Sequence, residues 1–328
     1  MKLATMRTGG RDGTLVIVDR ALERCVRPRG IAPTMQAAIE NWAAVEPLLR
    51  ALSNRLDLDE TVGAEPFDIA HCAAPLPRAY QFADGSAFLS HMELVRRSRG
   101  AEMPESFHTD PLIYQGLSDG FLGPRDDILL ADADWGIDFE AEIAVVLDDV
   151  PMGVTAAEAA RHIKLIMLCN DVSLRNLVPG EVAKGFGFYQ SKPASAFSPV
   201  AVTPDALGAA WDGARLHRPL VSQVNGREIG HPNAGADMTF GFPELIQHAA
   251  RTRRLGAGTI LGSGTVSNKD HRAVGSSCLA EVRAIETIEH GAPKTPFLQF
   301  GDVVRIEMFG ATGASIFGAI EQRVAQYG

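Results

Sequence analysis

The sequence has little cysteine, and its cysteines do not form a recognisable motif. Only 4 of the 328 residues are cysteine, and they are widely separated, with no Cys-x-x-Cys pair. A chain of this length can bury a large core without disulfides, and scattered cysteines are not typical of a zinc or iron–sulfur site. We therefore expect four reduced thiols in a cytoplasmic protein.

Long apolar runs and an excess of positive charge are also lacking. No apolar run reaches the roughly 18 residues of a membrane-spanning helix, and the first residues do not form the apolar core of a signal sequence. Acidic residues outnumber basic ones by 40 to 31, which gives a formal charge of −9. The sequence thus predicts a protein that binds neither a membrane nor an extended nucleic-acid surface.

A phosphate-binding loop is missing as well. Residues 258–264 are rich in glycine but lack the spacing of such a loop. No Gly-x-Gly-x-x-Gly follows a predicted strand elsewhere, so the sequence does not support nucleotide binding.

What the sequence does contain is a succession of short β-branched segments with a few helical patterns between them. The predicted strands are residues 14–18, 127–130, 139–147, 200–202, 220–224, 259–262, 279–285 and 303–308. The predicted helices are residues 34–52 with Thr34 as N-cap, 88–99, 156–166 and 243–253. Asn225-Gly226 is typical of a hairpin turn.

Two prolines within residues 73–78 interrupt regular structure and predict a linker. We therefore expect a small N-terminal domain over residues 1–76 and a larger domain over 77–328. The overall prediction is an α+β, β-rich protein rather than a doubly wound parallel sheet.

Two glutamates, Glu140 and Glu142, stand two residues apart at the start of the predicted strand 139–147. Side chains alternate along a strand, so both point to one face, roughly 6–7 Å apart. Buried anions repel each other and lose hydration, and a hard divalent cation between them relieves both effects. A Glu-x-Glu pair also occurs on the solvated face of an edge strand, so the pair alone leaves both interpretations open.

Asp171 adds a third carboxylate, at the point where the apolar segment 162–170 opens into a loop. Together with segments 138–142, 170–175, 191–192 and 261–265, it resembles the fumarylacetoacetate hydrolase family, from about Tyr80 to the C-terminus. The resemblance implies a mixed β-roll catalytic domain, a small SH3-like N-terminal β domain and a homodimer.

The resemblance also implies a metal site and a catalytic pair. Its metal ligands are Asp84, Glu140, Glu142 and Asp171, which hold Mg²⁺ or Ca²⁺, with Mn²⁺ as a further option because all donors are oxygen. Its catalytic residues are His91 as base, Glu281 as the carboxylate that orients it, and Lys192 at the oxyanion. On the residues alone, Asp84 equally suits a turn or a helix N-cap, and His91 a helix surface.

Three further residues match substrate-binding positions of the family: Arg175, Tyr114 and Thr265. Ser86 and Val178 depart from the hydrolases proper, which have a tyrosine and a polar amide there. These departures leave the substrate open without affecting the metal ligands.

The resemblance implies a metal-dependent hydrolase that cleaves a carbon–carbon bond in a 1,3-diketo acid. Its substrate would be fumarylacetoacetate, fumarylpyruvate or a related acylpyruvate, in aromatic catabolism such as tyrosine degradation. The same family includes 2-oxo acid decarboxylases and isomerases, and a β-rich binding module without activity is a third hypothesis. The pair His91 and Glu281 favours hydrolysis, because hydrolysis requires an activated water.

Overall fold

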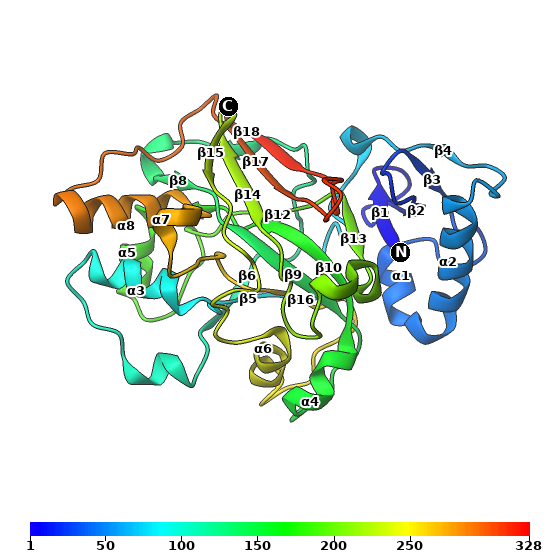
Figure 1. Ribbon diagram of the computed structural model, residues 1–328, viewed down its shortest axis with the longest axis horizontal. Coiled ribbons are helices and arrows are strands. Elements are labelled where there is room, and N and C mark those ends of the chain that lie inside the picture. The colour runs from blue at the N-terminus through cyan, green and yellow to red at the C-terminus, as the bar shows by residue number, and fades with distance from the viewer.

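The computed structural model describes residues 1–328, and its largest element is an 11-stranded mixed sheet that runs from the N-terminal strands at one end to β5 and β6 near the middle of the molecule (Figure 1). In spatial order its strands are β4 (Glu65–Pro66), β3 (Arg24–Val26), β2 (Thr14–Val18), β1 (Lys2–Met6), β13 (Val200–Val202), β10 (Ile163–Asn170), β9 (Ala141–Leu147), β16 (Ile260–Gly262), β5 (Phe82–Gly85) and β6 (Ile113–Gly116), with β12 (Ala196–Phe197) paired to β10.

Two smaller sheets complete the β-structure. The five-stranded sheet has the order β15 (Arg227–Gly230), β14 (Leu220–Val224), β17 (Val303–Met308), β18 (Ile320–Gln326) and β7 (Ile128–Leu130). The two-stranded sheet pairs β11 (Ser173–Leu174) with β8 (Ile137–Asp138). The molecule is therefore α+β and rich in sheet, as the sequence predicted.

Eight α-helices cover the ends and edges of the sheets. They are α1 (Met35–Glu40), α2 (Trp42–Asp57), α3 (Leu89–Arg97), α4 (Ala156–Ala159), α5 (Val178–Val182), α6 (Phe242–Ala249), α7 (His271–Val274) and α8 (Leu279–His290). Helices α3, α5, α7 and α8 gather at one end of the molecule, and α1 and α2 lie at the other (Figure 1). None of them combines the length and apolar character needed to cross a membrane.

The N-terminal strands extend the central sheet, because β1 pairs with β13 over three residues. Alternate residues of β9 then face two different cores. Ile143 and Val145 belong to a core of 50 buried residues, whereas Ala144 and Val146 pack in a core of 24 that includes the N-terminal helices. The first 76 residues thus share a sheet and a core with the rest of the chain, and the boundary at residue 76 stays a prediction.

Most predicted strands are confirmed. The predictions for 14–18, 200–202, 220–224 and 303–308 match β2, β13, β14 and β17 at both ends, and those for 127–130, 139–147 and 259–262 are shorter in the structure, as β7, β9 and β16. The hairpin is confirmed too, since Asn225 and Gly226 have positive φ between β14 and β15.

Two helix predictions and one strand prediction need correction. The helix at 34–52 is two helices that meet at Asn41, although Thr34 caps the first as predicted. The helix at 156–166 ends early, because Ile163 onward pairs with β9 as strand β10. The strand predicted at 279–285 is wrong, since these residues form the first turns of α8.

Candidate active site

Three adjacent strands bring Asp84 and Glu142 together across a glycine. In the central strand, β16, Gly262 pairs with Asp84 of β5 on one side and with Ala144 of β9 on the other. A Cβ atom on Gly262 would overlap the Asp84 Oδ1 and lie 3.1 Å from the Glu142 Oε2. Glycine is therefore required there for the two carboxylates to approach each other.

Asp171 joins them from the turn that follows β10. Asp84, Glu142 and Asp171 offer oxygen atoms that all lie within 4.8 Å of one another, and all three side chains are buried. Neither carboxylate oxygen of Glu142 has a hydrogen-bond partner. Buried carboxylate oxygens without donors are costly unless a cation satisfies them, so these residues fit a hard divalent cation.

The electrostatics of this carboxylate cluster agree with its geometry. Burial raises the pKa of Asp84 to about 8, with a further contribution from the Asp171 charge. Burial also raises the pKa of Glu142 well above its usual range, and Asp84 and Asp171 act in the same direction. The cluster therefore retains protons at neutral pH, which a bound cation would displace.

Glu140 lies beside the cluster but in a different environment. Its Oε1 is 2.5 Å from the Arg175 guanidinium, and its Oε2 is 2.8 Å from the Lys192 Nζ. Burial alone would raise the pKa of Glu140, but Arg175 and Lys192 hold it below the usual range. Lys192 also contacts Asp171, which joins this ion-paired group to the cluster. The role of Glu140 as a fourth metal ligand stays a prediction.

The predicted base and its orienting carboxylate form a pair. The His91 Nδ1, on α3, is 2.9 Å from the Glu281 Oε2, on α8, although the residues are 190 positions apart. Helices α3 and α8 lie side by side (Figure 1). With Nδ1–H donating to a carboxylate, the imidazole presents Nε2 as an acceptor. The arrangement suits a general base held in one tautomer.

Tyr114, on β6, also lies at the cluster. Its hydroxyl donates to the Asp171 Oδ2 at 2.6 Å. The Phe188 ring packs edge-on against it at 5.4 Å, and the Lys192 Nζ lies 5.1 Å from the Tyr114 ring centre. Burial raises the pKa of Tyr114 well above its usual value. Tyr114 is thus held as a neutral donor next to the carboxylates.

Thr265 lies in the loop that follows β16. It is 5% exposed and comes directly after Gly264, whose N–H donates to the Asp84 Oδ1 at 3.1 Å. The structure therefore brings Thr265 close to the carboxylate cluster. The substrate-binding roles of Thr265, Tyr114 and Arg175 stay predictions.

Three supporting residues were missed by the sequence reasoning: Asp138, Glu181 and Ser195. The Ser195 Oγ donates to the Asp171 Oδ1 at 2.7 Å, and Glu181 accepts hydrogen bonds from three successive amides that end at Ser191. Only Asp138 had a signal, because it begins the segment 138–142. Nothing local marks the other two, since their partners are set by the fold.

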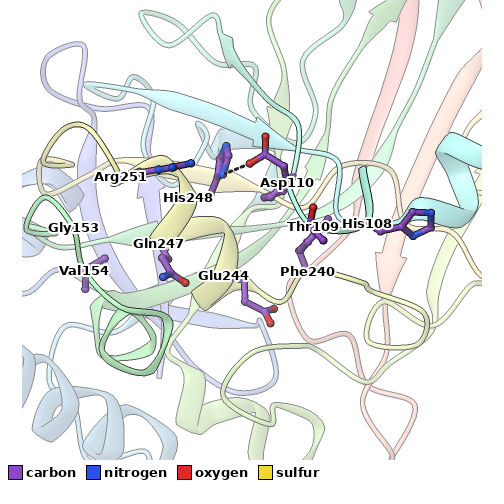
Figure 2. A pocket seen from close by; sticks show the side chains of 11 residues that line it. His108, Thr109, Asp110, Gly153, Val154, Phe240, Glu244, Gln247, His248 and Arg251 are labelled. Carbon is purple, nitrogen blue, oxygen red and sulfur yellow. Dashed lines mark ion pairs between the residues drawn. The ribbon is translucent and has the colours of Figure 1, made fainter. Parts of the chain in front are cut away.

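A separate open cavity of about 590 Å³ lies between α6 and the loop that precedes β6 (Figure 2). His248 and Asp110 face each other there, with 3.4 Å between Nδ1 and Oδ1. None of the ten predicted site residues lines this cavity. The Asp110 side chain is 63% exposed and stays solvated, unlike the buried carboxylates of the cluster.

Comparison with known families assigns both parts of the chain. The family described as fumarylacetoacetate (FAA) hydrolase C-terminal matches residues 81–325. The family described as fumarylacetoacetase N-terminal domain 2 matches residues 1–78. The two matches together cover almost the whole sequence.

Individual relatives carry several activities. The mitochondrial oxaloacetate tautomerase FAHD2A of Bos taurus is 28% identical over 159 residues, which is 48% of each chain. The fumarylacetoacetate hydrolase of Exiguobacterium antarcticum has a similar fold, with a TM-score of 0.66 and 19% identity over the full length of both chains. The maleylpyruvate hydrolase of Sphingobium sp. SYK-6, solved with manganese(II) and pyruvate, matches with a TM-score of 0.65 and 16% identity, also over the full length of both chains. At such identities the structural matches show a shared fold.

Proposed function

Because the chain belongs to the fumarylacetoacetate hydrolase family, we propose that it is a divalent-metal-dependent hydrolase acting on a carbon–carbon bond of a 1,3-diketo acid. The observation that carries the proposal is the His91–Glu281 pair, 2.9 Å apart, in a chain that also buries a cluster of three carboxylates. His91 lies close enough to Glu140 to contribute to the lowered pKa of that glutamate. Fumarylacetoacetate, fumarylpyruvate and related acylpyruvates are the substrates of this class.

The metal would be held by Asp84, Glu142 and Asp171, with Glu140 as a fourth ligand. The oxygen-only donor set favours Mg²⁺, Ca²⁺ or Mn²⁺, and the manganese in the Sphingobium maleylpyruvate hydrolase supports a metal of this type. When bound, the cation supplies Lewis acidity toward the carbonyl oxygens of a diketo acid.

His91 would act as the general base. Its Nε2 takes a proton from a water molecule, and the resulting hydroxide adds to one carbonyl carbon of the substrate. Glu281 keeps the Nδ1 proton in place and stabilises the imidazolium that forms. The bond between the attacked carbon and the adjacent carbon then breaks, and His91 returns the proton to the leaving carbon. The products are a carboxylic acid and a ketone or 2-oxo acid.

Two cations would bind the substrate's charge. Lys192 lies 8% exposed at the edge of the cluster and donates to an oxyanion there. Arg175 would contribute positive charge to a terminal carboxylate through the guanidinium N–H groups that Asp138 and Glu140 leave free. Both side chains are ion-paired with Glu140, which orients them before substrate arrives.

A second function is favoured by one comparison. The relative FAHD2A of Bos taurus is an oxaloacetate tautomerase, and isomerisation or decarboxylation of a 2-oxo acid needs no attacking water. The carboxylate cluster serves these reactions equally well. A requirement for His91 as water-activating base therefore separates hydrolysis from the alternative.

The test is an assay of purified protein with acylpyruvates and with oxaloacetate, in Mg²⁺, Ca²⁺ or Mn²⁺ and after chelation. We expect metal-dependent release of a carboxylic acid, which falls by about 10²–10⁴-fold in His91→Ala. Hydrolysis that survives both chelation and His91→Ala would refute the proposal. Oxaloacetate turnover without acylpyruvate hydrolysis would establish the alternative.

Four broader properties follow as proposals from the family. They are a homodimer, a cytoplasmic location, an SH3-like fold for the N-terminal strands and a place in aromatic catabolism such as tyrosine degradation. The dimer is tested by light scattering, where a mass near twice 35.1 kDa is expected.

A further inference from the structure

Asp138 is a buried carboxylate to which the function described above gives no role. It is 0% exposed and accepts three hydrogen bonds from two distant segments. The Leu279 and Ala280 amides donate at 2.8 and 2.9 Å, and the Arg175 Nε donates at 2.9 Å. One side chain thus joins the helix that carries Glu281 to a cation of the active site.

The first connection fixes the start of α8. The leading N–H groups of a helix have no partner within the helix, and Asp138 accepts from the first two of α8. The third residue of the helix is Glu281, whose N–H reaches only the weakly accepting Cys278 Sγ, at 3.4 Å. Asp138 therefore helps to set the backbone position from which Glu281 reaches His91, together with the Ala141 N–H, which donates to the Ser277 carbonyl at 2.9 Å just before the helix.

The second connection fixes Arg175. Strand β8 places Asp138 opposite Ser173 of β11, and the Arg175 N–H then donates to the Gly136 carbonyl at 2.8 Å. The Arg175 Nε meets Asp138 and another guanidinium nitrogen meets Glu140, so both sides of the planar group are held.

The first N–H groups of α8 are satisfied by a residue that is distant in the sequence and not by a neighbouring cap. Ser, Thr, Asp or Asn at position 278 would cap α8 from within the same segment, whereas Cys278 offers only sulfur. The stronger acceptor comes from 141 residues away and is the same group that holds Arg175. Asp138 is therefore in a position to couple the start of α8 to Arg175.

We propose that Asp138 is a positioning residue that simultaneously orients Glu281, and through it His91, and the guanidinium of Arg175. The proposal rests on the proposed function, since it assigns Asp138 to the base–orienter pair and to the substrate-binding cation of that site. It predicts two separable effects, one on kcat through Glu281 and one on KM through Arg175.

The experiment compares Asp138→Asn in the wild-type and Glu281→Gln backgrounds. We expect Asp138→Asn to lower kcat about tenfold or more and to raise KM, and to lower kcat less than twofold when Glu281 is already replaced. The increase in KM persists in both backgrounds. Thr155→Ala, which removes the cap of the distant helix α4, is the matched control and leaves both constants unchanged. An equal loss of kcat in the two backgrounds would overturn the proposal.

A rescue variant separates positioning from general loss of structure. Asp138→Asn with Cys278→Ser supplies a local cap for α8 but no partner for Arg175. We expect kcat to recover and KM to stay raised. The same double variant serves if Asp138→Asn alone does not fold. Recovery of neither constant in a folded double variant contradicts the assignment.

A substrate-free measurement keeps this inference distinct from the proposed function. In protein labelled with ¹⁵N-histidine, the His91 signals, assigned by their loss in His91→Gln, report its tautomer and its Nδ1 hydrogen bond. We expect these signals to shift in Asp138→Asn and to remain in Thr155→Ala. If the wild type cleaves no diketo acid, the proposed function fails, and an unchanged His91 spectrum in Asp138→Asn would separately refute the positioning role.

Discussion

Glu140 and Glu142 are two residues apart in the same segment, and both are buried, yet their environments are opposite. Glu140 meets Arg175 and Lys192 at 2.5 and 2.8 Å, whereas Glu142 meets no donor at all. The pKa of Glu140 is accordingly lowered and that of Glu142 raised. Chemically identical residues are thus made ion-paired or unpaired by what the neighbouring strands and loops bring to them.

The site therefore has two halves that differ in charge pairing. In the ion-paired half, around Glu140 and Arg175, each buried charge satisfies another, which stabilises the fold and orients the groups that the proposed function uses. The unpaired half, around Glu142 and Asp84, is costly to bury on its own, and in the proposed function that cost accompanies cation binding. Functional sites commonly carry such a conflict between stability and activity.

The largest expected effect comes from neutralising the unpaired half. Glu142→Gln should reduce metal-dependent turnover by about 10³-fold or more, because a bound cation supplies several kcal/mol of transition-state stabilisation and each 1.36 kcal/mol is tenfold. The same variant should melt at a higher temperature than wild type in chelator at pH 8, because the buried glutamate must take up a proton on folding at this pH whereas glutamine needs none. Glu158→Gln, at the surface cap of α4, is the control for the substitution. A less stable but active Glu142→Gln would reverse the assignment of the two halves.

Breaking the ion-paired half should instead unfold the protein more easily. Arg175→Leu leaves Asp138 buried without its cation and Glu140 with Lys192 alone, which costs about 3–5 kcal/mol in the free energy of unfolding. Arg50→Leu, which removes a surface pair with Asp205, should cost less than about 1 kcal/mol. Urea denaturation measures both, and equal losses would show that burial of the pair is unimportant.

A rise in pH should lower the stability of the unpaired half, around Glu142 and Asp84, whereas a divalent cation should raise it. A carboxyl whose pKa is raised, as for Asp84 to about 8, adds stability that is complete below about pH 4 and is lost as the pH rises through about 8. Chelated protein should therefore melt at a lower temperature at pH 8.5 than at pH 5.5. Mg²⁺, Ca²⁺ or Mn²⁺ at 100 times its dissociation constant should add about 2.7 kcal/mol at the higher pH. Chelated protein whose stability increases over this range would contradict the raised pKa.

The smallest effect tests the hydrogen bonds at the edge of the cluster. Ser195→Ala removes a donor to Asp171. It should weaken the free energy of cation binding, measured by calorimetry, by about 1.5 kcal/mol. Ser222→Ala is a matched control, because the Ser222 hydroxyl is buried without any partner and its loss should be neutral or stabilising. Similar changes in the two variants would show that Ser195 has no specific role.

Local pattern predicted most of this fold because strand residues carry their own signal. Val, Ile and Leu dominate β9, and a period of two identified its face. The start of α8 escaped prediction because its first two N–H groups are satisfied by Asp138, 141 positions before Leu279, and the alternation of apolar residues after Cys278 resembles a strand. The end of α4 escaped because Ile163 gains more from pairing with β9 than from continuing a helix.

The motifs predicted ten members of the candidate site but not how they pair. The structure groups Asp84, Glu142 and Asp171 and pairs His91 with Glu281, while the roles of all ten residues stay predictions. Which glutamate meets the cations depends on Arg175 and Lys192, which reach Glu140 and not Glu142. That choice is made by strand register and loop conformation, and no spacing in the sequence encodes it.

The separation of His91 and Glu281 along the chain also has a consequence for biosynthesis. At about 5–20 residues per second, a ribosome needs roughly 10–40 s to pass from one to the other, a distance of 190 residues. Until residue 262 has been added, the emerging polypeptide holds Asp84 but lacks the strand that supplies Gly262, so β5 has no neighbour on that side. A polypeptide that ends before residue 279 therefore contains His91 without the carboxylate that orients it, and the His91–Glu281 pair forms only near the end of synthesis.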